Sequence, residues 1–327
     1  MERRALGSSG LQVSRMGLGS MAWGRDTDWP TVKQLVNDFV DAGGNLIDTA
    51  PAYGGGVAER MIGKLLAGGI ARQDLVIATK AGFVIRDGKR VIDTSRSAML
   101  GDLEQSLRRL NTDHVDLWQV HAWGDAPIDE TLAAMDSAVS RGLARYVGVS
   151  NFVGWQTATA ATWQKALTGR TGLASVQVEY SLLARRAEVE VVGAAQHHRL
   201  GLLAWSALGR GALTGKYRTG IPRDSRAASD HFAWFLEPYM QPRSRSVVDA
   251  VAKAAEGLGL TPAQVALLWV RDAPCVASAL VGPRTTDHLK ELLEAESKIL
   301  VAPIVSALDD VSGGPNAYRS PTSSATS

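Results

Sequence analysis

Short, mostly apolar segments alternate with longer amphipathic segments along almost the whole chain. The short segments are typical of strands buried in a parallel sheet, and the longer ones of helices that cover it. We expect strands at residues 15–18, 45–48, 75–79, 114–120, 146–149, 175–178, 201–204 and 277–281. We expect helices at residues 31–42, 57–67, 95–110, 128–141, 154–167, 187–197, 244–258 together with 262–272, and 286–297.

The pattern within single segments supports these elements. Leucines recur at three- and four-residue steps at Leu100, Leu103, Leu107 and Leu110, which gives one helix a continuous apolar stripe. Thr261 followed by Pro262 is typical of a helix start, because threonine caps the first turn and proline is tolerated at its first position.

Strand–helix alternation repeated about eight times predicts an α/β fold with a parallel sheet. Eight such units favour a closed (β/α)8 TIM barrel over an open sheet. A chain of 327 residues is long enough for this barrel to form one domain, which we expect to span residues 1–311. The loops that follow the strands would then surround a single active-site mouth.

Composition excludes several classes of protein. Hydrophobic residues make up 45% of the chain and charged residues 21%, with a formal net charge of +2, so nothing general favours nucleic acid or an anionic membrane as a partner. Cys275 is the only cysteine, which excludes an intrachain disulfide. The amino-terminal segment lacks the apolar run of a signal peptide, and no apolar run is long enough to cross a membrane. We therefore expect a cytoplasmic protein.

Two segments do not fit the alternation. Residues 218–243 are rich in Arg, Ser, Pro and aromatic residues, and lie between the seventh strand and its helix. A loop of this length is either a lid that binds a ligand or a surface insertion with a small core of its own, and the sequence leaves both open. Residues 312–327 are polar, and we expect them to form a disordered tail.

Four residues with chemical potential stand at the ends of successive predicted strands. Asp48 closes the second strand and Tyr53 follows it, Lys80 closes the third strand, and His121 closes the fourth. All four would emerge at the same end of a barrel, which is where barrel enzymes place their catalytic groups.

These residue types suit proton transfer to a developing alkoxide. A phenol with a pKa of ~10 is a weak acid at neutral pH, and a neighbouring lysine cation favours its ionised form. Asp48 would keep Lys80 charged and in place, and His121 would donate a hydrogen bond to a substrate oxygen.

Each residue alone has a plainer interpretation. Asp48 alone would serve as a helix cap, Tyr53 as a packing residue, Lys80 as a solvated strand end and His121 as a structural histidine. Their joint position at strand ends favours the catalytic interpretation. The chain has no glycine-rich GxGxxG segment between a strand and a helix and no HExxH or HxxEH zinc pattern, so the residues alone identify neither a nicotinamide cofactor nor a metal.

At these residues the sequence resembles the aldo-keto reductase superfamily, and it has some similarity to the branch that contains the potassium-channel beta subunits. The resemblance extends from Arg4 to about Leu292 and rests on several independent segments in the same order: LGSSGLQVSRMGLGSMAWG, IDTAPAYG, GVSNF, VQVEYSLL and ALVGPRTTDHLKE. It implies an amino-terminal β-hairpin ahead of the barrel. It also implies NADP(H) as the cofactor, held extended across the barrel mouth.

The resemblance assigns roles to individual residues. Tyr53 would be the general acid, Lys80 and Asp48 would tune it, and His121 would orient the substrate carbonyl. Ser150, Asn151 and Gln177 would hold the nicotinamide carboxamide, with Trp205 stacked under the ring. The other implied cofactor contacts are Gly19, Ser20, Met21 and Asp48, then Ser206, Leu208, Gly209, Gly211 and Lys216 around the pyrophosphate, and Gly282, Arg284 and His288 near the adenosine 2′-phosphate.

The chain also departs from the family pattern. His288 and Leu292 stand where many relatives have Gln and Asn, which puts the adenine contacts in doubt. The stretch after Ile304 is short and polar, so the long carboxy-terminal substrate loop of some branches is missing. Trp23, Phe83, Trp123 and the loop at residues 218–243 would instead shape the substrate pocket. The plainer interpretation of Trp23 and Trp123 is that they pack within their loops.

The leading hypothesis is thus an NADPH-dependent reductase acting on a small-molecule aldehyde or ketone. A cofactor-binding regulatory subunit with little turnover is a second hypothesis. A barrel isomerase or hydrolase is a third, which explains fewer of the later segments. The sequence leaves open whether the substrate is a sugar, a keto-ester or a toxic aldehyde.

Overall fold

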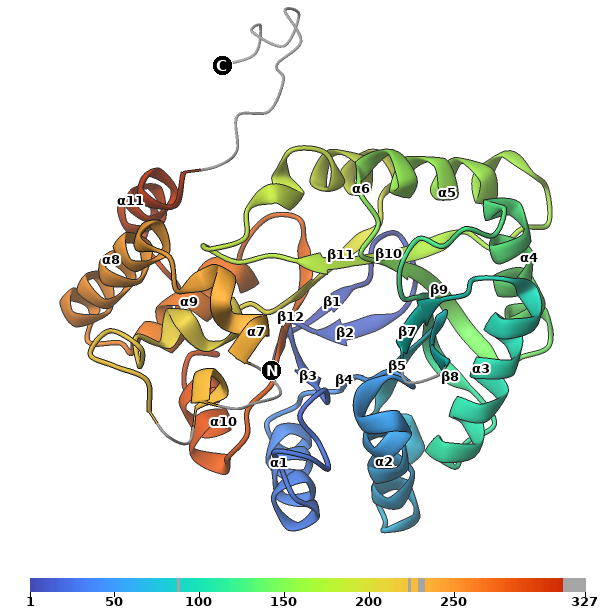
Figure 1. Ribbon diagram of the computed structural model, residues 1–327, viewed down its shortest axis with the longest axis horizontal. Coiled ribbons are helices and arrows are strands. Elements are labelled where there is room, and N and C mark those ends of the chain that lie inside the picture. Colours follow the sequence, from blue (N-terminus) through green and yellow to red (C-terminus); the bar gives the residue numbers. More distant parts are fainter. Residues whose placement is uncertain (87–88, 223–224, 229–232, 314–327) are drawn as a thin grey trace, which may run out of the picture.

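Eight parallel strands close into a barrel, as the alternating pattern predicts (Figure 1). The computed structural model describes residues 1–86, 89–222, 225–228 and 233–313. Around the barrel, each strand pairs with the strand before it and the last pairs with the first. The barrel strands are β3 (Met16–Gly19), β4 (Leu46–Asp48), β5 (Val76–Ala81), β8 (Val115–Val120), β9 (Ala144–Ser150), β10 (Leu173–Glu179), β11 (Gly201–Trp205) and β12 (Val276–Val281).

Helices form a ring around this barrel (Figure 1). They are α1 (Trp29–Asp41), α2 (Val57–Ala67), α3 (Arg96–Leu110), α4 (Ile128–Ser140), α5 (Gly154–Ala166), α6 (Val191–His198), α8 (Pro242–Leu258), α9 (Pro262–Arg271) and α10 (Thr286–Leu293). Thr261 caps α9 by accepting a hydrogen bond from the Gln264 backbone. Within the described ranges, none of the helices combines the length and apolarity needed to cross a membrane.

An antiparallel hairpin closes the amino-terminal end of the barrel. It consists of β1 (Arg3–Ala5) and β2 (Gln12–Ser14), and the family resemblance had predicted it. Leu6, Leu11 and Val13 of this hairpin pack into the inner apolar core with Leu46 and Leu117 from the barrel strands. Because the hairpin seals this end, the carboxyl ends of the strands form the accessible mouth.

Two predicted helices are shorter than expected. The helix expected at residues 187–197 begins only at Val191, after a 3-10 turn at Arg186–Glu188. In that turn the Arg185 guanidinium is forked onto the Glu188 carboxylate. The helix expected at 286–297 ends at Leu293, and the carbonyl groups beyond it accept hydrogen bonds from Arg271.

A second hairpin and a last helix were not predicted. A second hairpin, β6 (Phe83–Arg86) with β7 (Lys89–Ile92), follows β5 at the barrel mouth. The expectation of a short polar stretch after Ile304 is wrong, because α11 (Ala302–Ser312) forms there and lies beside α8 (Figure 1).

Arg185 holds α11 in place. Its guanidinium donates to the Asp309 carbonyl and to Ser312 Oγ, and the Trp269 indole donates to the Asp309 carboxylate. Ser312 therefore belongs to the helix and not to the expected tail. Residues 314–327 of that tail lie outside the described residues.

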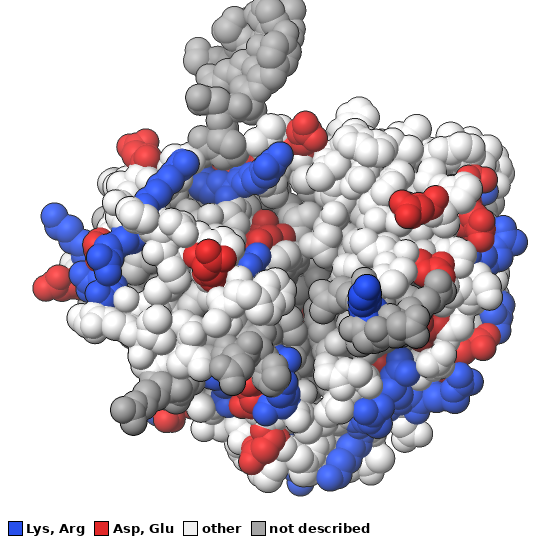
Figure 2. All heavy atoms as spheres, viewed as in Figure 1, with Lys and Arg blue, Asp and Glu red and all other residues white. Residues whose placement is uncertain are grey.

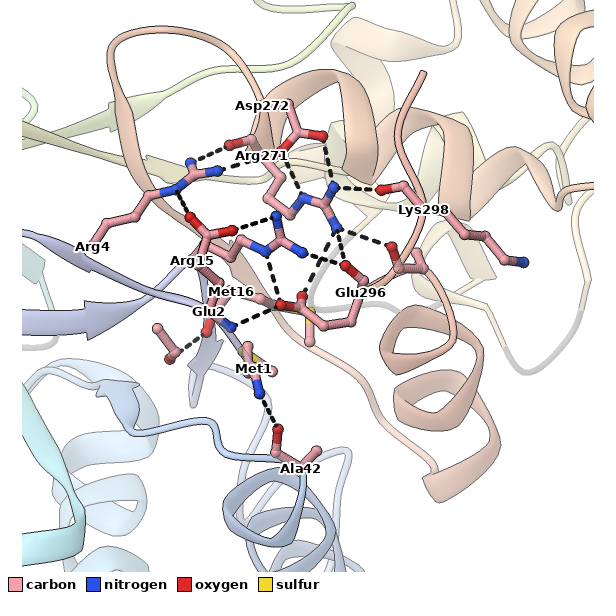
Figure 3. A network of polar contacts seen from close by, with 12 residues as sticks. Met1, Glu2, Arg4, Arg15, Met16, Ala42, Arg271, Asp272, Glu296 and Lys298 are labelled. Atoms are coloured by element: carbon pink, nitrogen blue, oxygen red, sulfur yellow. Dashed lines mark hydrogen bonds and ion pairs between the residues drawn. The ribbon is translucent and has the colours of Figure 1, made fainter. Parts of the chain in front are cut away.

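At the closed end of the barrel, arginine side chains join distant parts of the chain by hydrogen bonds and ion pairs (Figure 3). Arg271, at the end of α9, has a fully buried side chain that pairs with Asp272 at 2.6 Å. It donates to the carbonyl oxygens of Ala295 at 2.9 Å and Lys298 at 2.7 Å. Arg15 pairs with Glu296 at 2.8 Å, so the chain after α10 is bound to the barrel wall.

Replacing Arg271 by alanine should destabilise the fold strongly. The change leaves several buried acceptors without a donor, so we expect the free energy of unfolding to fall by about 3–5 kcal/mol. Urea denaturation followed by tryptophan fluorescence measures this. Arg3→Ala, on the exposed side of β1, removes the same charge and should cost less than about 0.5 kcal/mol. An equal loss in both variants would contradict this role of Arg271.

Candidate active site

The accessible mouth is a hollow with few charges at its centre. Figure 2 shows this face, on which basic and acidic side chains gather mainly along the rim. The β6–β7 hairpin stands at one side of the mouth and α7 (Ala233–Leu236) at the other (Figure 1).

A buried ion pair lies just inside the mouth. Asp48 ends β4, and Lys80 lies on the neighbouring strand β5 with its side chain 0% exposed. Lys80 Nζ is 2.8 and 2.7 Å from the two Asp48 carboxylate oxygens and 3.0 Å from the Thr49 carbonyl. Burial alone would lower the pKa of Lys80, but the charges and hydrogen bonds of Asp48 and Tyr53 outweigh it, and the pKa is raised. Lys80 is therefore held as a cation.

A glycine turn brings Tyr53 over this cation. Tyr53–Gly56 forms a 3-10 turn in which Gly54 and Gly55 have φ values of 58° and 61°. This left-handed backbone favours glycine, because a side chain there would be strained. The Tyr53 ring centre is 5.2 Å from Lys80 Nζ, and the phenol is a hydrogen-bond partner of the ammonium.

His121 completes the group of four. It follows β8, and its backbone N–H donates to the Ala81 carbonyl at the end of β5. Its ring stands edge-on to Tyr53 with 6.1 Å between ring centres, and 4.3 Å from the Phe83 ring. The structure thus brings together Asp48, Tyr53, Lys80 and His121, which their positions at strand ends predict to lie close to one another.

Amide and hydroxyl side chains continue the site across β9 and β10. Gln177 Nε2 donates to Asp48 Oδ1 at 2.7 Å, which joins this strand to the ion pair. Asn151 Nδ2 donates to the His121 carbonyl, and Asn151 Oδ1 accepts from the Trp205 indole at 3.0 Å. Ser150 Oγ accepts from Asn151 at 3.2 Å. The expected nicotinamide contacts therefore form one connected group beside Asp48.

The Gly19–Met21 segment lies on the opposite side of Asp48. Gly19 pairs with Asp48 in the sheet. The backbone N–H and the hydroxyl of Ser20 both donate to the Asp48 carbonyl, at 2.9 and 3.0 Å. This anchors the backbone of Asp48, so its carboxylate keeps a fixed direction.

The expected phosphate contacts lie in the loops after β11 and β12. Ser206, Gly209 and Gly211 all have left-handed backbone, in a loop that turns tightly after Trp205. Partial burial lowers the pKa of His288, and the charges of Lys216 and Arg284 lower it further. The two loops therefore bring two cations to the start of α10, whose first turn is capped by Thr285.

The segment after this loop packs over the barrel mouth. Arg210, from the 3-10 turn Gly209–Thr214, forks onto the Glu179 carboxylate at 2.8 and 2.7 Å. Its guanidinium lies 3.8 Å from the centre of the Phe235 ring on α7 and donates to the Phe235 carbonyl. The Phe235 ring is nearly parallel to Trp205, with 6.4 Å between ring centres. Leu236 and Tyr239 of the same segment also pack in a small apolar cluster with Ala212 and Tyr217. The described part of residues 218–243 thus has both expected features, contact with the mouth and a small core of its own, while residues 223–224 and 229–232 lie outside the described residues.

Aromatic side chains form the walls of the mouth. Phe83 and Trp123 are half-buried at the rim. Trp23 is only 1% exposed and packs in the core. The sequence reasoning missed Trp155, which is 58% exposed and lies 5.0 Å from Trp123 between ring centres. Its position just after the GVSNF segment was the available signal.

The sequence is similar to known oxidoreductases and to channel subunits. The sequence profile of the Aldo/keto reductase family matches residues 15–312. The chain is 35% identical to the uncharacterized oxidoreductase YrpG of Bacillus subtilis, over 96% of this chain and 97% of the relative. It is 34% identical to a probable voltage-gated potassium channel subunit beta of Arabidopsis thaliana, over 93% and 94%. It is 32% identical to the aldo-keto reductase YhdN of Bacillus subtilis, over 90% and 88%.

Replacing Glu179 by glutamine should loosen the α7 segment without unfolding the barrel. The change removes the charge that holds Arg210, and a hydrogen bond to a charged group contributes about 1.5–3 kcal/mol. We therefore expect the open population of this segment, and its cleavage by chymotrypsin at Trp234 and Phe235, to rise about tenfold. Glu237→Gln makes the same change on an exposed residue of the segment and is the control. Equal cleavage rates in wild type and Glu179→Gln would show that the Arg210–Glu179 ion pair is not needed to hold the α7 segment in place.

Proposed function

The chain belongs to the aldo/keto reductase family, and we propose that this oxidoreductase uses NADPH to reduce aldehydes or ketones to alcohols. The observation that carries the proposal is the buried Lys80 cation, held between the Asp48 carboxylate and the Tyr53 phenol. A cation fixed beside a phenol is the arrangement that proton transfer by tyrosine requires.

In this mechanism Tyr53 supplies the proton. A substrate carbonyl enters the mouth with its oxygen toward Tyr53 and His121. A bound nicotinamide supplies the hydride that the carbonyl carbon takes up. Negative charge then develops on the oxygen, and the Tyr53 O–H transfers its proton to that oxygen. Lys80 stabilises the phenolate that remains, while His121 stabilises the developing charge by hydrogen bonding.

The residues of the mouth fit a nicotinamide dinucleotide. Trp205 offers a planar indole, oriented by its hydrogen bond to Asn151, as a surface for the nicotinamide ring. Ser150 and Gln177 offer polar groups of the kind that bind a carboxamide. The left-handed loop after β11 lets backbone N–H groups approach phosphate closely.

The cations near α10 favour NADPH over NADH. Lys216 and Arg284 act together on His288 at the first turn of the helix. A helix start has unpaired N–H groups and a positive dipole end, and an arginine forks onto phosphate oxygens. This chemistry suits the 2′-phosphate that distinguishes NADPH.

The rim favours apolar or aromatic carbonyl substrates. The half-buried Trp123 and the exposed Trp155 have 5.0 Å between their ring centres, and Trp123 also packs on the buried Phe152. Such a surface binds flat apolar groups by stacking and by removing them from water. Aromatic aldehydes are therefore the first substrates to assay.

A regulatory subunit with little turnover is the second candidate. It is supported by the 34% identity to a probable potassium channel subunit beta. Turnover distinguishes the two candidates. The regulatory role is favoured if the protein binds NADPH tightly but hardly reduces any member of a broad panel of carbonyl compounds, and if a membrane protein co-purifies with it.

Replacing Tyr53 by phenylalanine should abolish most turnover and leave cofactor binding intact. The variant keeps the ring but lacks the proton that the alkoxide needs, so we expect kcat to fall by about 10²–10⁴-fold. Stopped assays with an aromatic aldehyde measure kcat, and fluorescence titration with NADPH measures binding. Wild-type kcat in this variant would disprove the acid role of Tyr53.

Replacing Arg284 by alanine should weaken NADPH binding selectively. The lost charged hydrogen bonds are worth about 1.5–3 kcal/mol, so the Kd for NADPH should rise roughly tenfold or more. NADH lacks the 2′-phosphate, and its Kd should stay unchanged. Fluorescence titration of both cofactors decides this, since a parallel loss for both would point to a general defect of the site.

A further inference from the structure

Outside the barrel, one face of α3 lies against the strand and the turn that carry Lys80 and Tyr53. Asp102, Ser106 and Arg109 share this face, because they are spaced by four and three residues along the helix. The face meets β5 and α2. None of these residues belongs to the site described above.

A buried carboxylate connects Arg109 to the strand of Lys80. Glu59 on α2 is 0% exposed and accepts a hydrogen bond from Arg109 Nε at 2.6 Å. Its other oxygen accepts from the Thr79 hydroxyl at 2.7 Å. Successive side chains on a strand point to opposite faces, so Thr79 faces the helices while Lys80 faces the barrel interior. The contact therefore fixes β5 one residue before Lys80.

A second carboxylate holds the same strand two residues after Lys80. The backbone N–H of Gly82 donates to Asp102 Oδ2 at 3.1 Å. Burial raises the pKa of Asp102, while this hydrogen bond and the nearby Arg109 charge act in the opposite direction. Two acidic side chains outside the barrel, Glu59 and Asp102, thus hold the chain just before and just after Lys80. The charge of Arg109 acts on both of them.

The turn that carries Tyr53 rests directly on Arg109. A Cβ added at Gly56 would lie 2.6 Å from Arg109 Cδ and 2.8 Å from Arg109 Nε. A Cβ added at Gly63, farther along α2, would lie 2.4 Å from the Arg109 carbonyl. Both glycines therefore permit a close approach between α2 and the end of α3. The Arg109 side chain fills the space under the turn.

We propose that Arg109 is a positioning residue that sets the geometry of Tyr53 relative to Lys80 from outside the barrel. The proposal rests on the proposed function only in so far as the Tyr53–Lys80 contact serves proton transfer. Arg109 does this through two contacts, its packing under the Tyr53 turn and its ion pair with Glu59. Since a displacement of about 1 Å in a reacting group can cost up to 10²-fold in rate, these contacts affect turnover.

The central experiment compares Arg109→Ala with Arg108→Ala. Arg108 is the exposed neighbour of Arg109 on the same helix, so both variants remove one cation and one long side chain. We expect Arg109→Ala to lower kcat about tenfold to a hundredfold with an unchanged Kd for NADPH, and Arg108→Ala to change neither. Arg109→Lys, which keeps the charge that pairs with Glu59, should recover part of the loss.

A titration that needs no turnover provides the second readout. The ionisation of Tyr53 is followed by ultraviolet difference spectroscopy, with Tyr53→Phe as the blank. If Arg109 holds the phenol against the Lys80 ammonium, the pKa of Tyr53 rises in Arg109→Ala and stays at the wild-type value in Arg108→Ala. A merely structural role lowers the melting temperature without moving this pKa.

A matched pair at Thr79 tests the same connection if Arg109→Ala does not fold. Thr79→Ser keeps the hydroxyl that binds Glu59, and Thr79→Val keeps the shape but loses the hydroxyl. We expect Thr79→Val to lower kcat and raise the pKa of Tyr53, and Thr79→Ser to resemble wild type.

The results separate the positioning role from the reductase activity. Unchanged kcat and an unchanged pKa of Tyr53 in both Arg109→Ala and Thr79→Val would overturn the proposal, and so would losses of kcat that only follow the folded fraction. If the wild-type protein reduces no carbonyl at all, the proposed function fails, whereas the titration still decides whether Arg109 positions Tyr53.

Discussion

The ion pair between Asp48 and Lys80 is the constraint on which the rest of the site depends. Transferring an ammonium from water to the protein interior costs several kcal/mol, and only close partners offset that cost. Asp48 supplies them only because Gln177 binds its carboxylate and Ser20 binds its backbone. In the sheet Asp48 lies opposite Ala78, so Lys80, two residues farther on, points to the same interior. Gln177 reaches Asp48 from β10, a strand that does not pair with β4, so this support of the ion pair requires the closed barrel.

The sequence predicted those features of the fold and the site that depend on the local pattern of apolar and polar residues. Alternating apolar segments give the eight strands, and strand ends give the positions of Asp48, Lys80 and His121. The elements it missed depend on distant contacts. Arg271 ends α10 early by binding the carbonyl groups beyond it, and Arg185 binds α11 through Asp309 and Ser312. No local pattern states which arginine will reach which carbonyl group.

At the candidate site, the aromatic residues also show that distant contacts cannot be predicted from the local sequence. Trp23 stands in the loop after β3 and Trp155 in the first turn of α5, and either ring would suit a pocket at the mouth. The structure buries Trp23 in the core, while Trp155 is exposed beside Trp123. Which ring faces the mouth depends on how each segment packs against its neighbours in the fold, and the local sequence does not state this. The same holds for Phe235, which reaches Trp205 only because Arg210 and Glu179 clamp its segment.

Tyr53 and Lys80, which we propose act together in proton transfer, belong to backbone segments of very different flexibility. Lys80 belongs to a strand with a paired strand on each side, and its charge is held by Asp48. Tyr53 begins a turn of three consecutive glycines, and glycine restricts the backbone least of all residues. A turn of this kind allows the tyrosine to fold back over Lys80, but it does not by itself keep it there. The rigidity has to come from what the turn rests on, and Arg109 fills that place. The outer layer of helices thus contributes to the site by supporting the one element that the strands leave flexible.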